Sequence, residues 1–145
     1  MQTAVRALAS SLDPLFRRIH DADDTIIEDQ IAIARVPAPT GGESARAELM
    51  VRRLRSAGLR NVEIDELGNV IALTGPRGLP PVVLCAHLDT VFESREPVHV
   101  HRAGPRLQAP GISDNARGLA TLATLADLVG SGQLDIKRPV LFAAT

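Results

Sequence analysis

The sequence predicts an α/β fold in which a layered central sheet carries helices on both faces. Three observations predict it. Apolar residues recur at helical spacing over the first 36 residues, whereas residues 62–73 alternate with the period of strands. The run 81–86 is continuously apolar, which is typical of a strand buried on both faces. An apolar helix at 116–129 and a second apolar run at 138–145 follow, so helices and strands interleave as they do in layered domains.

The first half of the chain carries clear helix boundaries. Thr25–Glu28 has the spacing of a capping box and predicts the start of a helix. Val36–Pro39 should end that helix, because residues before proline avoid the helical region. Thr40–Glu43 is a second capping box, and it predicts another helix that Gly58 ends in the left-handed conformation.

The strands are separated by turn residues. Two short strands in 62–73 should be joined at Glu66–Gly68, and the run 81–86 should place Cys85 as a buried side chain. The alternating segment Val98–His101 predicts an edge strand that turns back at Ala103–Pro105, and alternation alone explains the spacing of its two histidines.

The composition excludes several classes of protein. The 145 residues suit one domain, and their 45% hydrophobic and 23% charged content is ordinary for a globular chain. A net charge of -1 and an aromatic content of 2% argue against nucleic-acid binding. No apolar run approaches the roughly 18 residues of a membrane span, and a single cysteine allows no intrachain disulfide. We therefore expect a cytoplasmic protein with neither a nucleic-acid nor a membrane partner.

A polar pair directly follows the apolar run 81–86. His87 and Asp89 lie two residues apart at the expected strand end, so their side chains should project the same way. A neutral imidazole is a good zinc ligand, and its second nitrogen usually donates to a carboxylate that fixes the tautomer. The alternative is a histidine held by an aspartate at the sheet edge, since this short motif also arises by chance.

A second polar cluster, Ser113–Asn115, opens the helix at 116–129. Aspartate and asparagine are favoured N-cap residues, so capping explains the cluster by itself. The functional interpretation is that Asp114 presents a carboxylate beside the strand end that carries His87. We predict that the two side chains come within about 5 Å, close enough to share one metal at about 2.0–2.2 Å from each.

Together the two clusters resemble a known family. A strand ending in His87-x-Asp89-Thr-Val, then Gly111-x-x-Asp114-Asn-x-x-Gly opening an apolar helix, is similar to the co-catalytic zinc exopeptidases and deacylases. These include peptidase T, glutamate carboxypeptidase, acetylornithine deacetylase and succinyl-diaminopimelate desuccinylase. The loop 36–43 and the segment 65–70 also resemble this family, so the resemblance spans about residues 22–145.

The resemblance implies a zinc exopeptidase-like catalytic domain with two Zn²⁺ ions, although His and Asp ligands also suit Co²⁺ or Mn²⁺. His87 would be a terminal ligand of one metal, and Asp114 would bridge both metals and precede a cis peptide bond. Asp89, the catalytic residue of the set, would orient His87. The family's general-base glutamate follows a strand that resembles 140–145, and the sequence contains neither it nor the remaining ligands. We expect residues 1–145 to be the N-terminal part of the catalytic domain, with its remainder and a lid or dimerisation domain outside them.

The implied function is metal-dependent hydrolysis of peptide or N-acyl amide bonds by an activated water. The partners would be a peptide or N-acyl amino acid substrate and, in the intact protein, a second copy in a homodimer. The 145-residue part itself should be inactive. Two alternatives stay open: a single-domain zinc aminopeptidase of the related kind, and a non-catalytic α/β domain in which His87 and Asp114 serve only as caps.

Overall fold

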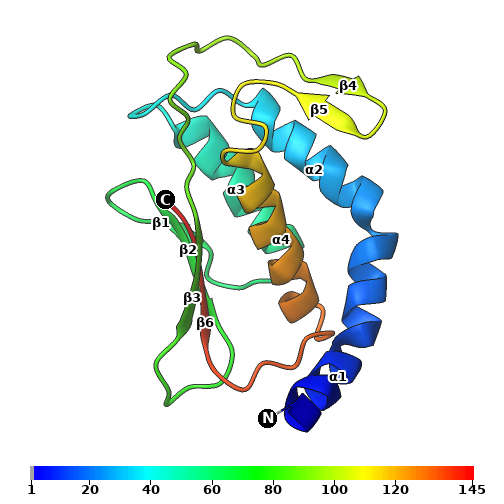
Figure 1. The fold of residues 1–145 in the computed structure, drawn as a ribbon. Helices are drawn as coiled ribbons and strands as arrows, with labels where there is room; N and C mark the ends of the chain where they lie inside the picture. The colour runs from blue at the N-terminus through cyan, green and yellow to red at the C-terminus, as the bar shows by residue number, and fades with distance from the viewer. Residues whose placement is uncertain (1) are drawn as a thin grey trace.

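A four-stranded mixed sheet forms one layer of the molecule, and the helices form the other (Figure 1). The structure is a computed structural model that describes residues 2–145. The elements are, in chain order, α1 (Gln2–Asp21), α2 (Asp23–Arg35), α3 (Ser44–Ser56), β1 (Glu63–Ile64), β2 (Val70–Thr74), β3 (Val82–Ala86), β4 (His101–Ala103), β5 (Arg106–Gln108), α4 (Ala116–Gly130) and β6 (Val140–Ala144).

The sheet has the strand order β1-β2-β6-β3. β2 runs antiparallel to β6, whereas β3 runs parallel to β6 and forms one edge of the sheet. The β4–β5 hairpin is a separate two-stranded unit, and it turns at 103–105 as predicted. The segment 98–100, which the sequence predicts as a strand, is irregular, and only His101 of the predicted edge strand belongs to β4.

The predicted turn between β1 and β2 is confirmed, and Asp65 stabilises it. The Asp65 carboxylate accepts hydrogen bonds from the backbone N–H groups of Leu67 and Asn69, each at 2.9 Å, and from the Asn69 side chain. This is the local bonding that favours aspartate in turns. The bonds from Asn69, first from its side chain and then from its backbone, hold the pKa of Asp65 below its ordinary value.

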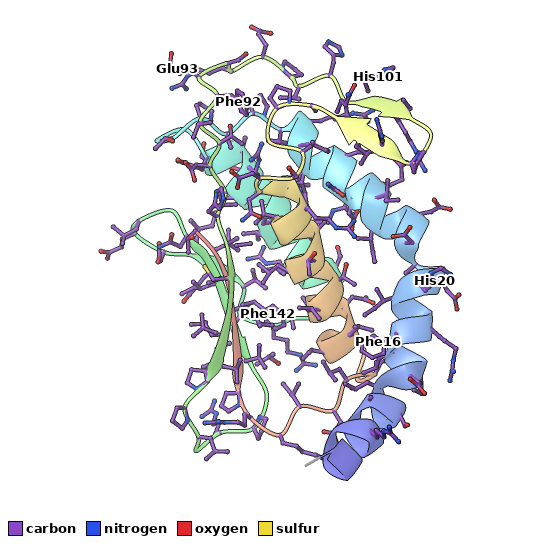
Figure 2. The ribbon with its side chains drawn as sticks, viewed as in Figure 1. Phe16, His20, Phe92, Glu93, His101 and Phe142 are labelled. Atoms are coloured by element: carbon purple, nitrogen blue, oxygen red, sulfur yellow. The ribbon has the colours of Figure 1, made fainter. Side chains whose placement is uncertain are left out.

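The core lies between the helices and one face of the sheet. Register places Ala72, Phe142 and Leu84 in one row across β2, β6 and β3, and Phe142 is fully buried. Figure 2 shows its ring in the space between the sheet and α4. The helices contribute the opposite wall of the core through the buried side chains Ile33, Ala34, Ala47, Met50, Leu54, Leu119, Ala120, Ala123 and Ala126.

The α/β layering is confirmed, but the helices of the described residues cover only one face of the sheet. α3 and α4 pack on the sheet and on each other, whereas α2 packs against α4 on the side away from the sheet and α1 leads directly into α2 (Figure 1). The expected second helical layer is therefore not formed by residues 2–145. The buried stripe of α2, which includes Ile26 and Ile33, packs against the other helices, so α2 lies on the same side of the sheet as they do.

The far face of the sheet is open and apolar. Leu73, Leu141 and Val83 form one row on it, and the outer two side chains are 57% and 56% exposed. This corrects the prediction that β3 is buried on both faces. Cys85 lies two residues beyond Val83 on the same face and is exposed, so the prediction that its side chain is buried is wrong.

The predicted C-terminal end of α2 is confirmed, whereas α2 and α3 each begin at a different residue from the one predicted. α2 ends at Arg35, as the proline at 37 predicts, but it begins at Asp23, two residues before Thr25, and Ala22 is its N-cap. α3 begins at Ser44 after the N-cap Glu43, and no side-chain capping bond forms. Across the described residues 2–145, no helix is both long and apolar enough to span a bilayer.

Candidate metal centre

His87 and Asp89 lie where β3 ends at the edge of the sheet. Leu88 between them is 1% exposed and is part of the buried core, so its two neighbours point the other way. The backbone here continues the sheet, because the Leu88 N–H donates to the Thr145 carbonyl and the Thr145 N–H donates to the Ala86 carbonyl. A buried side chain and two backbone bonds therefore fix this strand end.

Asp89 holds the imidazole of His87 from behind. His87 Nδ1 lies 3.1 Å from Asp89 Oδ1 and 3.0 Å from the Asp89 backbone carbonyl. With both acceptors on that side, Nδ1 carries the proton, which leaves Nε2 directed outward. The other carboxylate oxygen of Asp89 accepts a hydrogen bond from the Thr40 hydroxyl at 2.8 Å.

Asp114 meets the outward nitrogen of His87. It lies in the turn before α4, and its Oδ1 is 2.9 Å from His87 Nε2, so the predicted convergence of these side chains is confirmed. The peptide bond between Asp114 and Asn115 is cis, as the resemblance implied. The N-cap of α4 is Asn115, and no side chain makes a capping bond there, so capping does not account for Asp114.

Hydrogen bonding shifts the pKa values of His87 and Asp89 in opposite directions. Partial burial by itself lowers the pKa of His87, but the bonds to Asp114 and Asp89 outweigh it and raise the pKa above its ordinary value. The Thr40 hydroxyl, followed by His87, holds the pKa of Asp89 below its ordinary range despite some desolvation. Asp89 is therefore ionised at neutral pH, and His87 takes up a proton more readily than an unperturbed imidazole does.

Three supporting residues were missed by the sequence analysis. The Thr40 hydroxyl, assigned to a capping box, instead bonds Asp89. Arg46 is 1% exposed and donates to the carbonyls of Val36 and Leu88, and Gln30 is 7% exposed and donates to the carbonyl of Ile112. No local pattern indicates these roles, because each partner lies far along the chain or is a backbone carbonyl.

The donor set suits part of a zinc site. His87 Nε2 and Asp114 Oδ1 are the nitrogen and oxygen donors that zinc accepts, and their 2.9 Å separation lets one ion reach both at about 2.0–2.2 Å. Over residues 2–145, no three His, Cys, Asp or Glu side chains gather into one such set. The chain thus offers two converging donors and the carboxylate that orients one of them.

The other candidates do not join this centre. His99 and His101 are exposed, and Figure 2 shows His101 on the β4–β5 hairpin. Cys85 Sγ lies 3.7 Å from the Thr145 hydroxyl, and its side chain is exposed on the open face of the sheet. Both histidines are exposed, as expected, but the segment 98–100 is irregular, so the strand that was predicted to explain their spacing is not formed.

Comparison with known proteins places this geometry in a family. The sequence profile described as Peptidase family M28 matches residues 69–145, which is more than half of the chain and includes His87, Asp89 and Asp114. The chain belongs to peptidase family M28. The zinc-peptidase relationship inferred from the two polar clusters is therefore confirmed.

One curated relative of this M28 chain comes from Aeropyrum pernix and is described as a LysW-lysine/LysW-ornithine hydrolase. The two are 41% identical over 59 residues, which cover 41% of this chain and 17% of the relative. The M28 chain thus spans less than a fifth of the length of that relative.

Solved structures share the fold at low identity. A tripeptidase from Staphylococcus aureus aligns with a TM-score of 0.70 and 19% identity, covering 83% of this chain and 35% of that one. An aminopeptidase from the archaeon Desulfurococcus kamchatkensis aligns with a TM-score of 0.68 and 15% identity, covering 84% and 56%. These likenesses establish that the M28 chain has a zinc-exopeptidase-like fold, of which residues 2–145 form part.

Proposed function

We propose that the protein is a metal-dependent hydrolase of peptide or N-acyl amide bonds, with His87 and Asp114 as metal ligands. The observation that carries the proposal is the 2.9 Å approach of His87 Nε2 to Asp114 Oδ1, with Asp89 bonded to the far side of the imidazole. This is the arrangement in which a carboxylate orients a histidine ligand. Membership of an M28 peptidase family supports the reaction class.

Each residue has a distinct task in this proposal. Asp89 keeps the His87 proton on Nδ1, so Nε2 is free to act as a ligand once its proton is lost. Asp114 supplies two oxygens at the mouth of the site, where its side chain is 85% exposed, and so has room to bridge two ions. When bound, zinc supplies Lewis-acid activation of the amide carbonyl and of an attacking water.

The remaining ligands and the general base are proposed to lie outside residues 1–145. This rests on coverage, because the chain spans 35% of the tripeptidase and 56% of the archaeal aminopeptidase. We propose that residues 1–145 are the N-terminal part of a catalytic domain, that the whole protein works in the cytoplasm, and that it forms a homodimer. The metals are proposed to be two Zn²⁺ ions.

The substrate is proposed to present an apolar residue to the site. Val91 and Phe92 follow Asp89 directly, and they are 84% and 46% exposed. They line a hollow of about 310 Å³ beside the strand end, together with Pro39, Thr40, Thr90, Glu93 and Arg95, so the two apolar side chains lie among polar and charged ones. Large apolar side chains exposed together next to polar groups are typical of ligand-binding surfaces.

Metal content and hydrolysis test the proposal together. The protein expressed from its complete gene should retain zinc and cleave a panel of dipeptides, tripeptides and N-acetyl amino acids. His87→Ala and Asp114→Ala should each lose bound zinc, measured by mass spectrometry, together with activity. His101→Ala is the matched control, because His101 is an exposed histidine on the separate hairpin. Full zinc content in both site variants would refute the assignment.

A further inference from the structure

Buried polar side chains are few in this protein, and they gather around the metal centre. Among the described residues with placed side chains, the buried polar ones are Gln30, Arg46 and Thr90. Each bonds a backbone carbonyl in or beside a segment that carries the site. Buried polar groups are costly unless bonded, so their placement calls for a specific explanation.

Arg46 joins three segments beneath His87. Its Nη1 donates to the Leu88 carbonyl at 2.6 Å, and its Nε and Nη2 donate to the Val36 carbonyl at 3.1 and 2.5 Å. Leu88 is the residue between His87 and Asp89, so the guanidinium holds the peptide that sets the direction of both side chains. The fork geometry of arginine permits this double attachment, and lysine cannot reproduce it.

The charge of Arg46 makes simple core filling a poor explanation. Burial lowers the pKa of Arg46, and the nearby charge of Asp89 opposes that shift. Within residues 2–145 Arg46 forms no ion pair, so its burial is compensated by carbonyls and by the field of Asp89. An apolar residue could fill the same space without that desolvation cost.

Gln30 performs the corresponding task for the other arm of the site. Its Nε2 donates to the Ile112 carbonyl at 2.7 Å, and its Oε1 accepts from Arg117 Nη1 at 3.2 Å. Ile112 lies two residues before Asp114 in the turn that leads into α4. The amide therefore ties this turn to α2, whereas Arg46 ties the His87 segment to α3 and to the end of α2.

We propose that Arg46 and Gln30 are positioning residues that hold the His87–Asp89 arm and the Asp114 arm at the separation a shared metal requires. They touch neither metal nor substrate and act through the carbonyls of Leu88 and Ile112. Gln30 lies on α2, and Arg46 on α3 also bonds the Val36 carbonyl at the end of α2, so α2 takes part in supporting both arms. The metal part of the proposal rests on the proposed function, whereas the positioning of His87 and Asp114 does not.

The test uses Arg46→Lys and Gln30→Met in the protein expressed from its complete gene. Arg46→Lys keeps the charge but cannot hold both carbonyls, and Gln30→Met keeps the side-chain length without the amide. Arg55→Lys is the matched control, because Arg55 lies on the same helix and donates to the Val62 carbonyl at 2.9 Å away from the site. Two quantities are measured: zinc affinity by competition with a chromophoric chelator, and the ¹⁵N signals of the His87 ring in metal-free protein.

We expect Arg46→Lys and Gln30→Met each to weaken zinc binding about 10- to 100-fold, the range typical of residues that support metal ligands. The His87 ring signals should shift in both variants. Arg55→Lys should match the parent protein in both zinc affinity and ring signals. If Arg46→Lys fails to fold, Gln30→Met decides the question. Unchanged ring signals and unchanged zinc affinity in folded variants would overturn the proposal. A third outcome is that the ring signals of the variants differ from those of the parent, while the parent itself binds no zinc. That result would support the positioning role and refute the proposed function.

Discussion

A methyl group added at Gly111 should collide with the segment that carries Asp89, on the opposite side of the candidate metal centre. Gly111 lies in the turn before Asp114 and has a φ of +69°, in the left-handed region. A Cβ at this position would lie 2.7 Å from Cγ2 of Thr90, the residue that follows Asp89. The Gly111→Ala substitution therefore strains the backbone and also separates two segments that must stay together.

Both costs follow from the geometry. Carbon atoms in contact normally lie about 3.5–4.0 Å apart, so the methyl group requires a displacement of about 1 Å. Thr90 is fixed by a bond from its N–H to the Ala38 carbonyl at 2.8 Å, so it cannot yield freely. Overpacking costs about 1–3 kcal/mol, and a left-handed non-glycine backbone costs about 1–2 kcal/mol more. The sum is about 2–5 kcal/mol, which lowers the Tm by roughly 10 °C for a chain of this size.

Gly104→Ala separates the two contributions. Gly104 has a φ of +59° in the β4–β5 turn, and no atom lies within 4 Å of a Cβ built there. This control should lose only the backbone part, about 1–2 kcal/mol. Thermal unfolding followed by circular dichroism gives both Tm values, and zinc titration should show weaker binding for Gly111→Ala alone. Equal losses of stability in the two variants would refute the collision argument.

Further predictions concern charge, pH and apolar surface. Asp89→Asn should weaken zinc binding about 10-fold in equilibrium dialysis, because a neutral amide replaces the carboxylate behind the imidazole. Protonation of His87 competes with zinc, so zinc affinity should fall as the pH is lowered. Because the pKa of His87 is raised, this fall should start at a higher pH than for a histidine with the ordinary pKa of 6.5. In metal-free protein the protonated ring stabilises the fold at low pH, and this contribution is lost as pH rises through the folded-state pKa; His87→Ala should abolish that slope in denaturant titrations. Phe92→Ala should raise KM several-fold for apolar peptides with a smaller change in kcat. Replacing Leu73 and Val83 by Thr should reduce self-association of the 145-residue chain in sedimentation experiments, because both lie on the open sheet face.

The parts of the fold that the sequence predicted are those with local causes. The end of α2 follows from the proline at position 37, and the β1–β2 turn follows from Asp65 and the residues around it. The convergence of His87 and Asp114 was predicted because a strand end and a helix start meet at the same edge of a layered sheet.

The parts that the sequence did not predict depend on distant partners. Thr40 has the spacing of a capping residue, but its hydroxyl bonds Asp89, 49 residues away. Arg46 and Gln30 have nothing in their local sequence that indicates burial, since their partners are carbonyls at separations of 42 and 82 residues. The exposure of Cys85 was missed for a related reason. An apolar run indicates a strand, but it does not indicate whether helices cover one face or both.

The long sequence separation of the bonds around the candidate metal centre has a consequence for how the protein folds. Gln30 and Ile112 are 82 residues apart, and Arg46 and Leu88 are 42 apart, so no short stretch of chain can assemble the centre by itself. Contacts between distant residues form slowly, because each must first close a long loop. An ion that binds this centre would recognise only chains that have completed nearly the whole arrangement. Metal would then stabilise only the completed fold. It would slow global unfolding without affecting the first steps of folding.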